Sequence, residues 1–317
     1  MTRYLARSLV GMAVVLVAAT LITYLLIEAA PGDPVVALYA GNPDFTEADI
    51  ARIRSMYGLD RPVLLRWASW CMGLVRGDMG YSRVYRLPVV RVVRQRLANS
   101  LVLMGVSLMV SVCVAVPLGV LTAVRRNSLV DHVVSLMAYV GMSAPVFWTG
   151  LMAIWLFSVR LGLLPAGGTG GSGGRSLAGW LIHLILPAAV LSFFTVAPWV
   201  RYMRSSMLEV LGQEYMVAAR AKGLAERVVL FKHGLRNAIL PIITLIGLGI
   251  PSVVGGAVVT ETVFAWPGMG RLLYDSIISA DYSVAMGCLL VLCTLVVVSN
   301  LLADIAYSLA DPRVRLT

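Results

Sequence analysis

The sequence predicts an all-α integral membrane protein with six transmembrane helices. The chain of 317 residues is 59% hydrophobic and has a mean hydropathy of +0.85, both well above the values of soluble domains. Six stretches lack Asp, Glu, Lys and Arg and reach the about 20 residues that a helix needs to cross the hydrocarbon core. They are Ser8–Ile27, Leu97–Val124, Val133–Val159, Ser176–Val200, Ala238–Thr260 and Tyr282–Ala303. The first is read as a retained span, because the Pro-Gly-Asp-Pro sequence after it is no small-residue cleavage site.

The basic residues predict how these spans are oriented. Apart from the segment between the first two spans, Arg and Lys gather before the first span, after the sixth, and in the loops that follow the second and fourth. Positive charge favours the cytoplasmic side, so both termini are expected in the cytoplasm of a multi-pass protein of the cell membrane. The groups are Arg3 and Arg7; Arg125 and Arg126; Arg201, Arg204, Arg220, Lys222, Arg227, Lys232 and Arg236; and Arg313 and Arg315. The net charge of +10 is therefore assigned to topology, and nucleic acid is not expected as a partner.

Residues 31–96 form the largest segment between spans and are predicted to lie outside the cell, since long loops largely escape the charge rule. A capping-box pattern at 46–49 predicts a short helix, and an amphipathic stretch at 63–73 contains Trp67 and Trp70, which suit a membrane interface. A turn at 76–80 follows, and Pro88 begins a basic helix that continues into the second span. The expected plan is 1–30 for the N-terminus and first helix, 31–96 for an outer subdomain, and 97–317 for a five-helix core.

The residue types that catalysis and metal binding need are scarce. The three histidines and four cysteines show no ligand spacing, and no hydrolase or nucleotide-binding motif is present. The Gly-rich sequence at 165–174 lacks the Gly-Lys-Ser/Thr ending of a phosphate loop and is read as a flexible outer loop. The absence of acidic residues within the spans argues against an ion-coupled carrier. We therefore expect no catalytic residue, no metal site and no cofactor bound by this chain.

Prolines interrupt several spans, and proline kinks a helix because it removes a backbone hydrogen bond. They are Pro117, Pro145, Pro187, Pro198, Pro241 and Pro251. Such kinks suit a bundle that packs around a path and moves, although fixed kinks for packing are an equal alternative. Polar residues of the spans are candidates to line this path, and interhelical hydrogen bonding is their alternative role. The candidates are Asn99, Ser107, Ser111 and Ser143.

The segment at 214–236 is the largest charged loop on the predicted inner face. Its two halves show helical spacing, and Gly223 between them predicts a helix stop. Leu224, Val228, Phe231 and Leu235 recur at i, i+4, i+7 and i+11 and give the second half an apolar face. Such a compact, basic pair of helices either docks a cytoplasmic partner or lies on anionic lipid. The residues alone leave both possibilities open.

This segment reads Ala-Arg-Ala-Lys-Gly-Leu at 219–224, followed by His233 and by Leu-Arg-Asn at 235–237. In this form it resembles the EAA motif of ABC importer permeases of the peptide/nickel type. Arg236 stands where the general motif has proline, which favours the B-type subunit of that family. The resemblance implies a coupling helix that fits a groove on the ATP-binding subunit. The implied coupling residues are Glu214, Tyr215, Ala218, Ala219, Arg220, Lys222, Gly223, Leu224, Leu235 and Arg236.

Further motifs extend the resemblance over essentially the whole chain. They are PGDP at 31–34, RGDMG at 76–80, RLANS at 96–100, SAPVFW at 143–148, ETVFAWPGMG at 261–270 and DPR at 311–313. The resemblance implies a type I importer fold and one transmembrane subunit of an ATP-driven importer of dipeptides, longer peptides or related solutes such as nickel chelates. It also implies a homologous C-type permease as heterodimer partner, two ATPase subunits or one fused ATPase that bind ATP and Mg²⁺, and an extracytoplasmic solute-binding protein.

The outer surface on which a solute-binding protein docks is expected in the 31–96 subdomain and in residues 261–281. The candidate residues are Trp67, Arg76, Asp78, Glu261, Arg271 and Asp275. Two other functions stay open. A secondary transporter would take up solute without ATP, and a membrane scaffold that recruits a soluble enzyme would move no solute at all.

Overall fold

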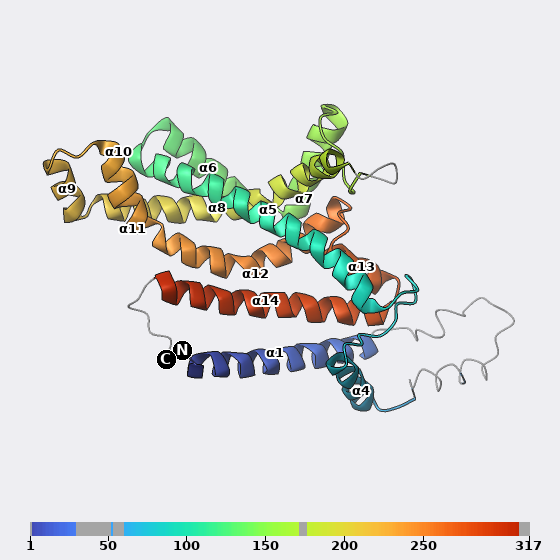
Figure 1. The fold of residues 1–317 in the computed structure, drawn as a ribbon. Coiled ribbons are helices and arrows are strands. Elements are labelled where there is room, and N and C mark those ends of the chain that lie inside the picture. The colour runs from blue at the N-terminus through green and yellow to red at the C-terminus, as the bar shows by residue number, and fades with distance from the viewer. Residues whose placement is uncertain (1, 30–51, 53–59, 171–175, 311–317) are drawn as a thin grey trace. The chain divides into compact units, whose positions relative to one another are not determined.

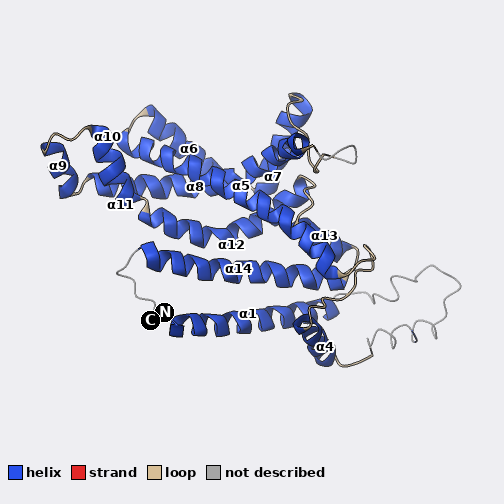
Figure 2. Ribbon diagram, viewed as in Figure 1, coloured by secondary structure: helices blue, strands red, loops and turns tan. Residues whose placement is uncertain are grey.

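The computed structural model describes residues 2–29, 52, 60–170 and 176–310. These residues form helices and loops, with a single isolated bridge between Tyr81 and Pro88 (Figure 2). A helix satisfies its own backbone hydrogen bonds, as a segment in lipid must. The longer elements, labelled in Figure 1, are α1 (Thr2–Ala29), α4 (Val63–Val75), α5 (Val89–Val124), α6 (Leu129–Ser143), α7 (Val146–Ala153), α8 (Leu177–Leu211), α12 (Leu240–Val263), α13 (Met269–Ile278) and α14 (Tyr282–Ala310).

Four of the described helices are long and apolar enough to cross a membrane, and they coincide with the first, second, fourth and sixth predicted spans. They run over Arg7–Ala29, Val89–Val124, Leu177–Leu211 and Tyr282–Leu302. The fifth predicted span falls on α12, whose 24 residues extend about 36 Å at 1.5 Å per residue. Its crossing of the membrane, and the cytoplasmic position of both termini, stay predictions.

The third predicted span, Val133–Val159, is not one straight helix. It is divided between α6 and a second piece, α7 with the π-helical turn η1 (Ile154–Arg160), and the two pieces meet at an angle of 112°. Pro145 causes the break: a residue before proline is pushed out of the α region, and Ala144 accordingly has φ −76° and ψ 137°. The bent pair is either one broken span or a re-entrant loop. The kink expected at this proline is thus present, but it is far sharper than a bend within a span.

The chain divides into two compact units. The first contains Met1–Leu5, Ala98–Arg271 and Leu295–Thr317, and α8 is its central helix, packed against α6, α7 and α12. Leu103 of α5, Leu191 of α8 and Val253 of α12 belong to one buried cluster, which Trp266 closes. The helices of this unit approach closely because small residues lie between them. A Cβ at Gly141 of α6, for example, would lie 3.0 Å from the Cβ of Ala197.

The second unit contains Ala6–Leu97 and Leu272–Thr294. The amphipathic stretch predicted at 63–73 is α4, and the helix predicted after Pro88 is the start of α5. The turn predicted at 76–80 is also confirmed, since the amide of Gly80 donates to the Asp78 carboxylate at 2.8 Å. The Ser82 hydroxyl donates to the buried carboxylate of Asp281. The helix predicted from the pattern at 46–49 lies outside the described residues.

Candidate functional site

The segment that joins α8 to α12, residues 214–238, is here called the knob. It consists of α9 (Glu214–Ala221), α10 (Glu226–Val228), the π-helical turn η2 (Val229–Leu235) and α11 (Arg236–Ala238). Figure 1 shows these elements grouped at the C-terminal end of α8. Two short helical pieces separated by a glycine were predicted, and the structure confirms them. The second piece, however, is not a regular α-helix.

The knob has a small interior of its own. Met216 and Ala219, three residues apart on α9, are buried together with Val229, and Val210 and Leu211 of α8 pack against them. Burial of apolar surface here fixes α9 on the end of α8. Ala219 therefore faces the chain itself, which corrects the expectation, implied by the resemblance, that it contacts the ATP-binding subunit. Its neighbour Ala218 is exposed.

The outer face of the knob is apolar and basic. Leu224, Val228 and Phe231, predicted as an apolar helix face, are exposed at 40%, 38% and 59%, and Leu235 alone of that set is half-buried against the cluster of α8 and α12. The buried residues of the π-helical turn are instead Val229 and Gly234, which lie five positions apart. Val217 and Tyr215 of α9 add further exposed apolar surface, and the same segment carries five exposed basic residues. They are Arg220, Lys222, Arg227, Lys232 and Arg236.

Gly223 ends α9 as predicted. Its φ is +74°, in the left-handed region that glycine adopts without steric cost. A Cβ there would meet nothing within 4 Å, so the position selects glycine for its backbone conformation and not for space. The chain reverses at this residue and returns as α10.

Two polar contacts hold the pieces of the knob together. The Asn237 amide donates to the hydroxyl of Tyr215 at 3.1 Å and ties α11 to the first turn of α9. The Arg220 guanidinium pairs with Glu226 across the Gly223 turn, Nη2 to Oε1 at 3.1 Å. This hydrogen bond raises the pKa of Arg220. Arg236, by contrast, extends into solvent from the end of η2.

An ion pair fixes the last turns of α8, which lead into the knob. Arg204 binds the Asp131 carboxylate with two hydrogen bonds, Nε to Oδ1 at 2.7 Å and Nη2 to Oδ2 at 2.8 Å. Asp131 also accepts from the backbone amide of Asn127 at 3.0 Å and is 4% exposed. The turn between α5 and α6 is thereby tied to α8. Sequence reasoning placed Arg204 in a cytoplasmic loop and missed this pair, because no local pattern connects residues 73 positions apart.

Two of the residues predicted to line a path lie between α5 and α8. Ser107 and Ser111 are buried, and their hydroxyls donate to the backbone carbonyls of Leu103 and Ser107 at 2.7 Å. Ser192 of α8 donates to the carbonyl of Ser107 at 3.1 Å, so the two helices share this polar seam. The arrangement favours the alternative role of these serines as interhelical hydrogen-bond partners.

The other two path candidates lie apart from this seam. Asn99 is half-buried, and its amide donates to the carbonyl of Pro267 at 2.8 Å. Ser143 is exposed at the C-terminal end of α6. A path role for either residue stays a prediction.

Glu261, predicted as part of the outer docking surface, is fully buried. Its carboxylate accepts hydrogen bonds from the hydroxyl of Ser100 and from the amides of Gly270, at 2.7 Å, and Arg271, at 3.2 Å. The Ser100 hydroxyl in turn accepts from the amide of Met269 at 2.7 Å. We call these five residues the cradle. A carboxylate enclosed in this way is inaccessible to another protein, so its expected docking role is corrected to a structural one.

The remaining docking candidates differ in exposure. Arg76 and Asp78 are exposed in the turn after α4, whereas Trp67 is half-buried and donates to the hydroxyl of Thr20 at 3.4 Å. Arg271 is half-buried and donates to the carbonyl of Ala265 at 2.5 Å. Asp275 is half-buried on α13. Arg76 and Asp78 are thus the accessible ones, and their docking role stays a prediction.

The family of this chain follows from its sequence match. Residues 115–316 match the model described as "Binding-protein-dependent transport system inner membrane component", and residues 1–104 match the N-terminal model of the same systems. The chain belongs to this family. It is therefore a multi-pass protein of the cell membrane and a permease component of ABC transporters.

Full-length relatives and a solved structure agree with this assignment. The oligopeptide transport system permease protein AppB of Bacillus subtilis is 42% identical over 99% of both chains. The dipeptide transport system permease protein DppB of Escherichia coli K12 is 37% identical over 93% of this chain and 94% of that protein. An inward-facing structure of the MetNI methionine ABC transporter matches with a TM-score of 0.58 over 69% of this chain and 96% of its own, at 19% identity. This last likeness establishes the type I importer permease fold.

Proposed function

We propose that this permease is one of two transmembrane subunits of an ATP-driven importer that moves peptides into the cytoplasm. The peptide class is supported by relatives named as oligopeptide and dipeptide permeases that match along nearly the whole chain. The homologous partner is a C-type permease, and an extracytoplasmic solute-binding protein delivers the peptide. ATP and Mg²⁺ are bound by two ATPase subunits or one fused ATPase, because this chain has no Walker A sequence.

The observation that supports this proposal best is the outer face of the knob. Val217 and Phe231 are exposed at 61% and 59% on a segment that also carries exposed basic side chains. Apolar surface with a polar rim is typical of a protein–protein interface. The knob also begins where α8 ends and finishes where α12 begins. A partner that moves the knob therefore moves two core helices directly.

The mechanism that fits these connections is alternating access. ATP closes the ATPase pair and draws the two knobs of the permease dimer together. The two helical bundles then rock so that the cavity between the subunits opens outward and receives the peptide. Hydrolysis restores the inward-facing state. Within this chain, the rigid contacts of Met216 and Val229 with the end of α8 transmit the movement.

The experiment that tests the proposal compares two neighbouring substitutions. Ala218→Glu adds a charge to the exposed face of α9, and Ala219→Glu adds the same charge to its interior. We expect Ala218→Glu to reduce both co-purification of the ATPase and ATP-dependent peptide uptake at least about tenfold, which corresponds to about 1.4 kcal/mol of lost binding, while thermal stability is retained. Ala219→Glu should lower thermal stability as well, because it buries an unpaired charge.

Uptake is measured in proteoliposomes that contain both permeases and the ATPases, with binding protein outside and ATP trapped inside. Uptake that proceeds without ATP would identify a secondary carrier. Normal, ATP-dependent uptake by Ala218→Glu would show that the outer face of the knob is not the coupling surface. Gly223→Pro is a second test, since proline cannot adopt the φ of +74° found there.

A further inference from the structure

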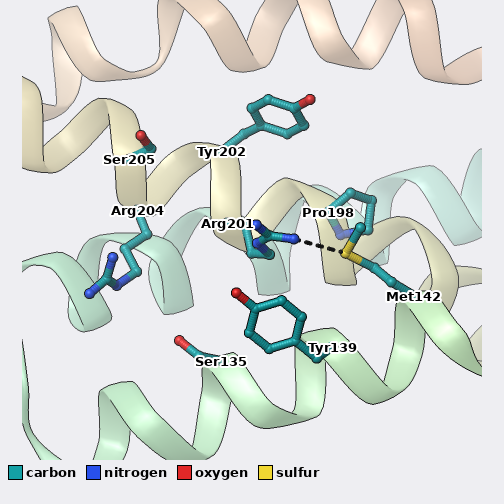
Figure 3. A pocket seen from close by; sticks show the side chains of 8 residues that line it. All are labelled: Ser135, Tyr139, Met142, Pro198, Arg201, Tyr202, Arg204 and Ser205. Atoms are coloured by element: carbon teal, nitrogen blue, oxygen red, sulfur yellow. Dashed lines mark hydrogen bonds between the residues drawn. The ribbon is translucent and has the colours of Figure 1, made fainter.

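A cleft of about 420 Å³ opens between α6 and α8 in the first unit, within the about 300–1,000 Å³ of small-ligand sites. Figure 3 shows Tyr139 and Met142 of α6 directed toward α8, and Arg201 of α8 directed toward Met142, whereas Tyr202 and Ser205 project away from α6 in this view. Its lining is Ser135, Tyr139 and Met142 from α6 and Pro198, Arg201, Tyr202, Arg204 and Ser205 from α8. Four of these residues bear hydroxyl groups and two bear guanidinium groups. The cleft therefore combines hydroxyl and cationic groups with apolar surface from Met142 and Pro198.

Arg201 supplies the charge of this cleft. Its guanidinium lies 4.7 Å from the centre of the Tyr139 ring and its Nη1 is 3.5 Å from the sulfur of Met142. These contacts hold the guanidinium over an aromatic face without neutralising it. Among the residues that the structure describes, no carboxylate pairs with Arg201. Arg204, the other cation, is already neutralised by Asp131.

The two faces of α6 differ in a way that separates the cleft from a lipid-facing surface. Ser135, Tyr139 and Met142 recur at i, i+4 and i+7 along the face that lines the cleft. Val133 and Leu136, on another face of the same helix, are exposed at 50% and 59%. Exposed aliphatic side chains suit contact with lipid, whereas the hydroxyl groups of Ser135 and Tyr139 suit a polar ligand. The cleft thus interrupts the apolar surface at the position of an unneutralised arginine.

The cleft also lies on the helix that enters the knob. Arg201 is the first charged residue after the apolar stretch of α8. It precedes Glu214, the first residue of the knob, by 13 positions, about 20 Å along a helix. A ligand held there contacts α8 directly. Binding in the cleft and movement of the knob are therefore connected through one continuous helix and the turn after it.

We propose that this cleft is a binding site for a carboxylate of the transported peptide, with Arg201 as the charged partner. The inference rests on the proposed function, from which it takes the ligand class. Arginine is suited to this role because its planar guanidinium can offer a carboxylate two parallel hydrogen bonds. The hydroxyls of Ser135 and Tyr139 also line the cleft. The same oxyanion chemistry would bind the phosphate of an anionic lipid, so the test separates these two sources.

The test measures how a peptide protects the cleft from alkylation. The assembled complex, with Ser205→Cys in this chain, is placed in nanodiscs and treated with a maleimide, and the modified position is identified by mass spectrometry. The probes are dialanine, tetraalanine and their C-terminal amides. We expect the free carboxylates, and not the amides, to slow modification of position 205 saturably. The matched reporter is Ser279→Cys, which is exposed on a loop after α13 and should react at an unchanged rate.

Substitution of the arginine identifies the charged partner. Arg201→Gln in the Ser205→Cys background should raise the concentration of dialanine needed for half protection by about tenfold, the effect expected for losing one charge-assisted contact. For Arg201→Lys, the dialanine concentration needed for half protection should lie between those of the Arg201 and Arg201→Gln proteins, because lysine keeps the charge without the planar pair of donors. Equal protection by carboxylates and amides, or no protection by either peptide, would overturn the proposal.

Nanodiscs of neutral lipid and nanodiscs that contain phosphatidylglycerol distinguish the two sources of oxyanion. Protection by phosphatidylglycerol alone would assign the cleft to lipid and overturn the peptide site. Uptake measured on the same preparation keeps the two proposals separate. ATP-dependent uptake without carboxylate protection would refute only the site, whereas carboxylate protection with uptake indifferent to ATP would support the site and refute the ATP-driven importer.

Discussion

The two ends of α12 differ in whether the groups around them find their partners within the chain. Near Leu240 the chain emerges from the knob, whose large apolar side chains Val217 and Phe231 remain exposed. Near Val263 it enters the cradle, where the buried Glu261 carboxylate accepts three hydrogen bonds from its own chain. The cradle is thus satisfied internally. The knob leaves its main apolar surface exposed in the described chain, and we expect the proposed ATPase to cover it.

This difference predicts how each end responds to substitution. A buried polar group is costly when its partners are removed, so the cradle should govern the stability of the isolated chain. An exposed face contributes little to that stability, so the knob should govern assembly and uptake instead. The following substitutions test this division, from the largest expected effect to the smallest.

Glu261→Ala should have the largest effect on stability. It leaves the hydroxyl of Ser100 and the amides of Gly270 and Arg271 without their common acceptor. At about 1–3 kcal/mol for each unsatisfied buried group, we expect a loss of at least about 3 kcal/mol. The measurement is thermal unfolding of the purified chain in nanodiscs. Glu261→Gln, which keeps the shape of the side chain and one acceptor oxygen, should lose less stability than Glu261→Ala.

The control for this substitution is Glu226→Ala, which removes a carboxylate from the exposed knob. Its expected change is within about 0.5 kcal/mol. If the two variants lost equal stability, the contrast between a structural cradle and an interaction surface would be wrong.

Asp131→Ala should give an intermediate effect. It removes the acceptor from Arg204, whose side chain is 27% exposed. A fully buried pair broken in this way costs about 3–5 kcal/mol, and partial solvation of the arginine reduces our expectation to about 2 kcal/mol. A double-mutant cycle with Arg204→Ala isolates the pair itself. Additive losses would show that the two side chains stabilise the chain independently.

The sequence predicted the parts of this fold that depend on local pattern. Charge-free stretches of about 20 residues or more located four membrane helices. Gly223 marked the end of α9, because a left-handed backbone favours glycine. Pro145 also indicated a break in the third span. The angle of 112° could not be inferred, since it depends on how α7 packs against α8 and α12.

Long-range contacts explain what the sequence did not reveal. Glu261 stands at the end of an apolar stretch, where an acid is ordinarily solvated, and its buried state depends on Ser100, 161 residues away. In the knob, a period of 3.6 residues assigned Val228 and Phe231 to one face but did not say whether that face was inside. Val229, the first residue of the π-helical turn, is the one that is buried against Met216 and Ala219. The sequence analysis likewise attributed the charge of Arg201 to membrane topology. Its contact with Tyr139 could not be inferred, because Tyr139 belongs to a different helix.

Gly223→Ala tests the conformational part of the knob. Forcing a side chain into the left-handed region costs about 1 kcal/mol, and no clash adds to it because the space around the Cβ position is open. We expect the knob to loosen locally, as measured by faster amide exchange in α9 and α10, with the thermal midpoint nearly unchanged. Ala225→Gly, at an exposed position with φ −57°, is the control for altered backbone freedom. Unchanged exchange in Gly223→Ala would show that the turn conformation does not hold the two pieces together.

Glu226→Gln should have the smallest effect, because it removes only the exposed pair with Arg220. Such a pair contributes about 0.5 kcal/mol or less, and salt screens it, so the variant and the native chain should become equal at high ionic strength. Glu226 raises the pKa of Arg220, so the contribution of this arginine is fully present below its ordinary pKa and is lost as pH rises through the raised value. Amide exchange of α9 should therefore differ between the two chains by the same factor from about pH 6 to about pH 9, after correction for the intrinsic exchange rate. If the ratio of exchange rates changed with pH within that range, another titrating group would hold the turn. The knob would then depend on internal polar contacts, as the cradle does.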